Sequence, residues 1–136
     1  MKRIQTVKGT NSLTAYFSVQ GVTDDQTGAA WITAALQLSI FVPRAVRLAW
    51  AEGEQGSPSN IVEEFRPNEL YGDKLALEMR VLPVDTIFVP GSYLGDPLVL
   101  GFRCRNSSVF ISVPANTQIT PAKMNDLLRE LDQIRI

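Results

Sequence analysis

Few residues of this chain are equipped for nucleophilic or acid–base chemistry. Its 136 residues include no histidine and one cysteine, Cys104, within the segment Gly101-Phe-Arg-Cys-Arg105. Flanking arginines can lower the pKa of an exposed thiol. In an alternating run, however, Cys104 shares a strand face with Phe102 while the arginines point the other way. We therefore interpret Cys104 as a small buried apolar residue.

The acidic residues form no pattern of a known site. The adjacent pairs Asp24-Asp25 and Glu63-Glu64 match no calcium-loop spacing and are typical of solvated turns. A nitrogen and sulfur metal site is disfavoured without histidine. Two carboxylates in a cleft would suffice for glycoside hydrolysis, but no pair is marked out. We predict no catalytic residue, no metal and no cofactor, and we expect that the chain is not an enzyme.

Arginines in apolar segments are the stronger candidates for binding. A sheet face lined with arginine can contact phosphates while aromatic rings stack on bases. The net charge of −1 lacks the overall basic field of most nucleic-acid-binding proteins. We keep a local basic face as a candidate contact for nucleic acid or another partner, formed by Arg44, Arg47, Arg103 and Arg105.

Strict alternation of apolar and polar residues predicts the elements that would position these side chains. It predicts strands at 12–20 and 74–82, with further strands at 86–89, 98–105 and 108–113. Residues 29–38 fit a helix or a strand, and we favour a strand over 32–42 because of its β-branched residues. The residues 52–60 predict a loop. Apolar–proline pairs that end strands or protect sheet edges are Val42-Pro43, Leu82-Pro83, Val89-Pro90 and Val113-Pro114.

The end of the chain predicts a helix over about 120–136. Thr120 is a favourable N-cap, and Pro121 stands at the first helical position. One apolar helical face contains Met124, Leu127, Leu128, Leu131 and Ile134. The fold class is therefore mainly β: an antiparallel sandwich or barrel with one C-terminal amphipathic helix. We expect a single domain over 1–136, whose basic segment 1–10 is an edge strand or a loose arm.

Apolar residues occur on both faces of the predicted strands, so a helix, a second sheet or another subunit must cover the second face. The candidate interface residues are Tyr16, Phe41, Phe110, Leu127 and Leu131. The leading hypothesis is a structural, self-assembling homo-oligomer such as a virion coat or decoration protein. The alternative is a binding module for a small apolar ligand, a peptide or nucleic acid. Because we find no signal peptide or membrane-spanning run, we expect a cytoplasmic or virion location without a membrane partner.

Overall fold

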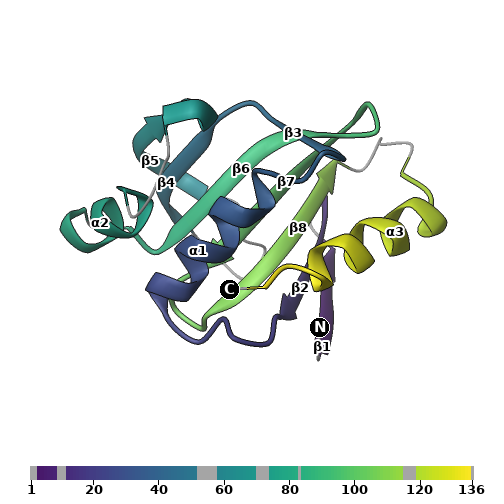
Figure 1. Ribbon diagram of the computed structural model, residues 1–136, viewed down its shortest axis with the longest axis horizontal. Coiled ribbons are helices and arrows are strands. Elements are labelled where there is room, and N and C mark those ends of the chain that lie inside the picture. Colours follow the sequence, from purple (N-terminus) through teal and green to yellow (C-terminus); the bar gives the residue numbers. More distant parts are fainter. Residues whose placement is uncertain are drawn as a thin grey trace.

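An antiparallel sheet with helices beside it organises the chain (Figure 1). The computed structural model describes residues 3–8, 12–51, 58–69, 74–82, 84–114 and 119–135. The strands within these ranges are β1 (Arg3–Lys8), β2 (Ser12–Ser18), β3 (Phe41–Pro43), β4 (Val46–Ala51), β5 (Pro58–Phe65), β6 (Thr86–Tyr93), β7 (Asp96–Arg103) and β8 (Ser108–Pro114). The helices are α1 (Asp25–Ala35), α2 (Lys74–Val81) and α3 (Pro121–Asp132), and a short 3₁₀ helix, η1, spans Pro67–Glu69. The mainly antiparallel β fold with a C-terminal helix is confirmed.

The strands follow the order β1-β2-β8-β7-β6-β4-β5, and β3 pairs with β6. Strand β6 changes neighbours along its length: residues 86–88 pair with β4, and residues 91–93 pair with β3. Pro90 lies at this junction, where its carbonyl accepts a hydrogen bond from the Arg44 N–H (2.8 Å). A proline has no N–H to give to a ladder, so the break between β3 and β4 is where β6 tolerates one.

The apolar–proline pairs that the structure describes have two outcomes, and Pro83 of the pair Leu82-Pro83 lies outside the described residues. Pro43 and Pro114 end their strands, as expected. The expectation that Val89-Pro90 ends a strand is wrong, because β6 continues to Tyr93.

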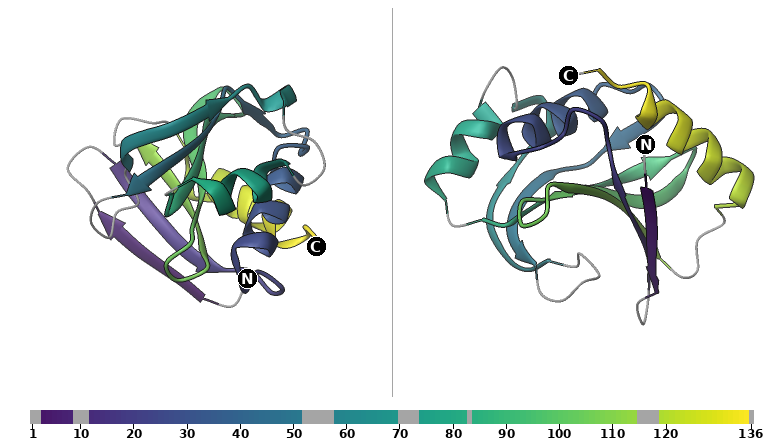
Figure 2. Two further views of the ribbon diagram at one scale, coloured as in Figure 1. Left: turned by 90° about the vertical axis from the view of Figure 1, so that its left-hand side faces the viewer. Right: turned by 90° about the horizontal axis from the view of Figure 1, so that it is seen from below.

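The helices described lie on one side of the arched sheet (Figure 2). The core between them contains the fully buried Trp31 of α1, Phe102 of β7, and Leu127 and Leu131 of α3. Burial of each such side chain stabilises the fold by roughly 1.5–3 kcal/mol. We call this side of the sheet the helix-covered face and the opposite side the helix-free face.

The predicted C-terminal helix is confirmed as α3. The Thr120 hydroxyl accepts a hydrogen bond from the Lys123 N–H (3.2 Å), and Pro121 is the first helical residue. Leu127 and Leu131 are fully buried, while Met124 and Leu128 are partly buried against the same core. Lys123 also pairs with Asp96 at the start of β7 (3.1 Å). Local capping and apolar spacing were sufficient to define this element.

The strand predicted at 74–82 is wrong, because Lys74–Val81 forms α2. Leu75 and Met79 are buried, whereas Leu77 and Val81 are 54% and 67% exposed. An alternating pattern places apolar residues two and four positions apart. Residues four positions apart also share one face of a helix, so the pattern fits both kinds of element. Leucine, alanine, glutamate, methionine and lysine all favour a helix, and only Val81 is β-branched. This composition was the signal that the alternation obscured.

The strand favoured over 32–42 is also wrong for most of its length. Residues 25–35 form α1, and strand structure begins only at Phe41. The start of α1 is a capping box: the Thr27 N–H donates to the Asp24 carboxylate (2.8 Å), and the Asp24 N–H donates to the Thr27 hydroxyl (3.1 Å). The sequence contained this signal in its Asp-Asp-Gln-Thr segment, which we interpreted as a turn.

The N-terminal segment forms an edge strand over residues 3–8, which is one of the two alternatives expected. Most of the predicted loop, residues 52–57, lies outside the described residues, and residues 58–60 belong to β5.

Candidate functional site

The helix-free face is built by a cross-strand row that runs through five strands. In register, Arg47 of β4 stands opposite Phe88 of β6, and Phe88 stands opposite Gly101 of β7. Gly101 in turn is opposite Phe110 of β8, which is opposite Tyr16 of β2. Because residues opposite one another in a ladder share a face, this row places an arginine and three aromatic rings on one surface.

These rings form a small apolar cluster, separate from the main core. Tyr16, Phe88 and Phe110 are 8%, 7% and 1% exposed, and they pack with the buried Ala49 and the partly buried Val99. The Tyr16 and Phe110 ring centres lie 5.8 Å apart. A Cβ at position 101 would overlap the Phe110 ring, so this ring requires the glycine beneath it. The arched sheet thus buries residues on both of its sides.

Arg47 lies on this cluster with its charge neutralised. Its guanidinium carbon is 5.5 Å from the centre of the Phe88 ring. Its Nε donates to a carboxylate oxygen of Glu64 on β5, at 2.6 Å. The Arg47 and Glu64 side chains are 33% and 51% exposed, so the pair is of surface character and contributes little net stability.

Arg103 lies on the same face and differs from Arg47 in both burial and partners. It is 5% exposed, and its guanidinium carbon is 5.9 Å from the centre of the Tyr16 ring. Within the described ranges its guanidinium has no ion pair and no hydrogen bond. None of the guanidinium nitrogens is both fully enclosed and without a hydrogen bond among the described residues. The charged end of Arg103 therefore still reaches solvent.

The register neighbours of Arg103 are two small hydroxyl residues. Thr86 of β6 and Ser108 of β8 stand opposite it on either side. The Thr86 hydroxyl donates to Asp85 (2.9 Å), and the Ser108 hydroxyl donates to Asn106. Their hydroxyl protons are therefore engaged, and the guanidinium is the remaining strong donor group among these three residues.

The four arginines predicted as a basic face do not come together. Arg47 and Arg103 share the helix-free face, whereas Arg44 is exposed in the connection between β3 and β4. Arg105 lies beyond β7, and its largely exposed side chain is 3.5 Å from the carboxylate of Asp85.

The five predicted interface residues also divide between the two faces. Tyr16 and Phe110 belong to the aromatic cluster of the helix-free face. Phe41, Leu127 and Leu131 are buried in the main core, against other residues of the same chain. Their burial is therefore intramolecular, and in this structure none of the three is available to a partner.

The surroundings of Cys104 make its thiol unreactive. Burial raises the pKa of the Cys104 thiol to about 12, and the nearby carboxylates of Asp25 and Asp85 act in the same direction. A thiol with this pKa is protonated at neutral pH, and the thiolate is the nucleophile. The flanking arginines do not activate it.

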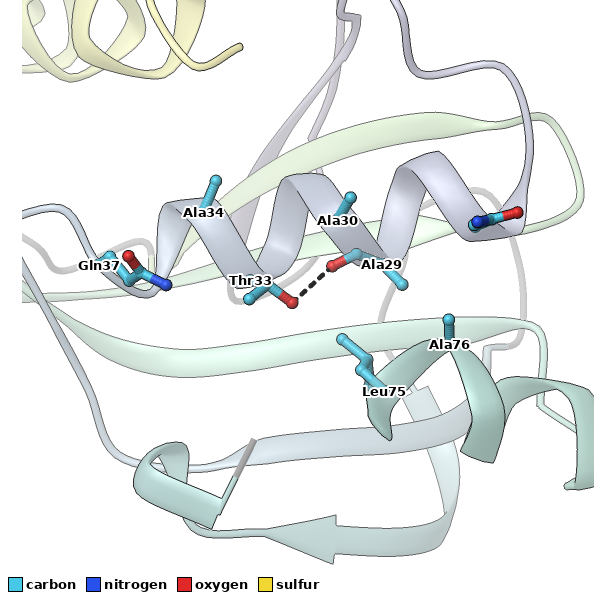
Figure 3. A pocket seen from close by; sticks show the side chains of 8 residues that line it. Ala29, Ala30, Thr33, Ala34, Gln37, Leu75 and Ala76 are labelled. Atoms are coloured by element: carbon cyan, nitrogen blue, oxygen red, sulfur yellow. Dashed lines mark hydrogen bonds between the residues drawn. The ribbon is translucent and has the colours of Figure 1, made fainter. Parts of the chain in front are cut away.

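A shallow groove lies between α1 and α2 and has a volume of about 300 Å³ (Figure 3). Four of its lining residues are alanines: Ala29, Ala30, Ala34 and Ala76. Its central polar group, the Thr33 hydroxyl, donates to the Ala29 carbonyl (2.9 Å). None of the lining residues can ionise, so the groove has no group for acid–base or charge-based recognition.

The described residues contain no recognisable metal site, and no relative of known function assigns a site to this chain. No group of three or more cysteine, aspartate or glutamate side chains within the described ranges could hold a metal ion. The helices described are all too short or too polar to cross a membrane. No family model matches this chain, and no match was found among curated proteins or solved structures.

Sequence reasoning identified Arg47, Arg103, Tyr16 and Phe110 but missed three members of the site. Phe88 and Gly101 fall within the strands predicted at 86–89 and 98–105, and nothing in those two segments marks either residue as part of a site. Glu64 was interpreted as a solvated acid, although it distinguishes the two arginines. No local signal pairs Glu64 with Arg47, because their contact depends on the register of β4 with β5.

Proposed function

We propose that this protein is a non-catalytic binding module, and that the helix-free face of its sheet is the binding face. The observation that carries the proposal is Arg103, a nearly buried cation on an aromatic ring with no acidic partner in the described part of the chain. The stem of Arg103 is buried while its guanidinium still reaches solvent, so the charge is held in a fixed place and stays accessible. A fixed, accessible charge without an acidic partner among the described residues is characteristic of a binding site.

A ligand of modest size fits this face better than a nucleic acid. Base stacking requires aromatic rings that present their faces to solvent, but Tyr16, Phe88 and Phe110 are at most 8% exposed. Among the described side chains, neither Arg44, in the connection between β3 and β4, nor Arg105, which pairs with Asp85, has a contact with these rings, so the described residues show no extended basic track. Nucleic acid is therefore the less favoured ligand class.

Aromatic NMR resonances provide a direct test, because each face has its own rings. A panel of small carboxylic acids, apolar peptides and single-stranded oligonucleotides is titrated into ¹³C-labelled protein. We expect a binder to shift the ring signals of Tyr16, Phe88 and Phe110, while those of Phe17 and Phe102 on the helix-covered face stay unchanged. A panel that shifts no ring signal of the helix-free face, or shifts only those of the opposite face, contradicts the proposal.

Self-association is a second candidate function, as expected of an assembly subunit such as a virion protein. It is favoured by the two terminal strands of the sheet, β1 and β5, each of which has one strand neighbour in the described sheet. An unpaired strand edge is a template for another chain. The outward residues of α2, Leu77 and Val81, add exposed apolar surface.

Light scattering coupled to size-exclusion chromatography tests this second candidate. An assembly subunit gives a mass that is a multiple of the 15.0 kDa chain and that rises with concentration. The double variant Leu77→Glu/Val81→Glu changes only exposed positions, so it separates association through α2 from association through the strand edges. A mass equal to one chain at every concentration contradicts self-association and leaves the binding-module proposal intact.

A further inference from the structure

The two arginines on the helix-free face form a natural comparison within one molecule. Each lies over an aromatic ring at similar distance, 5.5 Å for Arg47 over Phe88 and 5.9 Å for Arg103 over Tyr16. Arg47 is bound by the carboxylate of Glu64, and Arg103 has no such carboxylate within the described residues. Among the described residues, Arg103 therefore has the same kind of ring contact as Arg47 but lacks a carboxylate partner such as Glu64.

A guanidinium that lies over a ring keeps its hydrogen-bond donors for another partner. The cation–π contact uses the face of the guanidinium plane, while its N–H groups point outward within that plane. This planar set matches the two oxygens of a carboxylate or phosphate. The aromatic ring and the buried stem of Arg103 also fix its position, so less conformational entropy is lost when an anion binds.

The charge of the surroundings distinguishes between these anions. Arg47 is already neutralised by Glu64, and Asp85 accepts hydrogen bonds from Thr86 and Arg105. Among the side chains that the structure describes on this face, one uncompensated positive charge therefore remains, that of Arg103. A monoanion neutralises it fully, whereas a dianion such as phosphate leaves a net negative charge beside buried apolar rings, which is unfavourable.

We propose that Arg103 anchors a monocarboxylate ligand on the helix-free face, through paired hydrogen bonds from a guanidinium held over Tyr16. The inference rests on the proposed function, because it names the ligand class of that same face. The neighbouring hydroxyls of Thr86 and Ser108 donate elsewhere, so recognition depends on the arginine. The small exposed part of Tyr16 (8%) offers a limited apolar contact, which favours a carboxylate that carries an apolar group over one without such a group.

The test titrates acetate, benzoate and inorganic phosphate into the full chain at constant ionic strength. The readouts are the Arg103 side-chain Nε–H signal and the ring signals of Tyr16. We expect benzoate to bind more tightly than acetate, and phosphate to bind most weakly. We expect Arg103→Met to weaken benzoate binding about tenfold or more, the range for loss of hydrogen bonds to a charged group. Arg103→Lys retains the charge without the planar donor set and should weaken binding several-fold.

Arg47→Met, combined with Glu64→Gln, is the matched control, because it removes the other ring-bound arginine together with its carboxylate partner and leaves the net charge of the face unchanged. It should change the dissociation constant for benzoate by less than about twofold, since Glu64 already occupies that arginine. Circular dichroism of each variant establishes that it is folded. If Arg103→Met does not fold, the benzoate affinity of Arg103→Lys provides the test, because lysine keeps both an apolar stem and the positive charge.

Several results would overturn the inference. They are unchanged benzoate binding in a folded Arg103 variant, an equal loss in the Arg47→Met/Glu64→Gln control, and phosphate as the tightest of the three ligands. If the rings of the helix-free face respond to other compounds but not to carboxylates, the carboxylate anchor is wrong and the binding module stands. If no compound of the wider panel reaches those rings, both proposals are wrong.

Discussion

The two faces of the sheet are both buried, but they are built by opposite chemistry. The helix-covered face is closed by α1, α2 and α3 over large apolar side chains such as Trp31 and Phe102. The helix-free face has one small aromatic cluster, and its arginines lie on the rings. The first face buries large apolar side chains, whereas the second also buries most of a charged residue, Arg103. We infer that the second face is the one shaped by binding.

The comparison also applies within the helix-free face. Arg47 is partly exposed and ion-paired, which is how proteins ordinarily place an arginine on a sheet. Arg103 is nearly buried and has only its ring contact among the described residues. One surface therefore contains an exposed, ion-paired arginine and a nearly buried arginine without an ion pair among the described residues. The substitutions below compare their effects on stability.

The largest effect is expected on the helix-covered face. Leu127→Asp places a charge at a fully buried position between α3 and the sheet, and it should reduce the free energy of unfolding by more than about 3 kcal/mol. Leu128→Asp, at the neighbouring partly buried position, should have a clearly smaller effect. Urea denaturation measures both variants. Equal losses would show that α3 does not dock through the stripe that contains Leu127.

On each face a glycine packs directly against a phenylalanine ring, which allows a matched pair of substitutions. A Cβ at Gly28 would overlap the Phe102 ring, and a Cβ at Gly101 would overlap the Phe110 ring. We expect Gly28→Ala and Gly101→Ala each to destabilise the protein by about 1–3 kcal/mol, as overpacking does. The loss should be larger for Gly28→Ala, because α1 must then move away from β7.

A smaller phenylalanine replacement provides the control for this pair. Phe110→Leu combined with Gly101→Ala should recover part of the loss, and Phe102→Leu should do the same for Gly28→Ala. Thermal and urea denaturation give the coupling energies. An absence of coupling on the helix-free face would mean that Phe110 does not pack over Gly101.

The two arginines should respond oppositely to removal of their charge. Arg103→Met keeps a stem of similar length and removes a nearly buried cation that has no ion pair among the described residues, so stability without ligand should be unchanged or rise by about 1 kcal/mol. Arg47→Met breaks an exposed ion pair and should lose about 0–1 kcal/mol. Urea denaturation in ligand-free buffer compares them. A loss above about 2 kcal/mol for Arg103→Met would show that its charge stabilises the fold.

The last prediction concerns the thiol of Cys104, which directly follows β7. With its pKa at about 12, Cys104 should react slowly with a disulfide reagent at pH 8 and rapidly after denaturation. The unfolded thiol loses its proton near its ordinary pKa of 9.0, below the folded value, so stability should fall as pH rises from about 9 toward 12. A Cys104→Ala variant, compared over the same pH range, isolates this contribution. Rapid labelling of the native protein would contradict the burial of the thiol.

Prediction from the sequence succeeded at α3, where capping and apolar spacing agree, and failed at α1 and α2, where the apolar spacing fits both a helix and a strand. Thr120 and Pro121 determine the start of α3 within a few residues. In α2, by contrast, the alternation around Leu75 and Met79 fits a strand and a helix equally. Burial of Leu75 against the core selects the helix, and that contact involves segments distant in the chain.

The site was predictable as a set of residue types but not as an arrangement. An arginine on a strand with apolar neighbours is a reasonable binding candidate, and Arg103 and Arg47 both met that description. Arg47 differs from Arg103 because it pairs with Glu64 and because its side chain is 33% exposed, whereas Arg103 is 5% exposed. Neither property can be read from the residues adjacent to an arginine.

The sequence by itself determined the antiparallel β character, the capped C-terminal helix and the lack of histidine chemistry, because these follow from composition and short-range backbone preferences. Only the tertiary structure decided that Arg103 lies over Tyr16 and that Arg47 binds Glu64. Strand order, register and sheet curvature set those contacts. They depend on the packing of the whole chain rather than on any one segment.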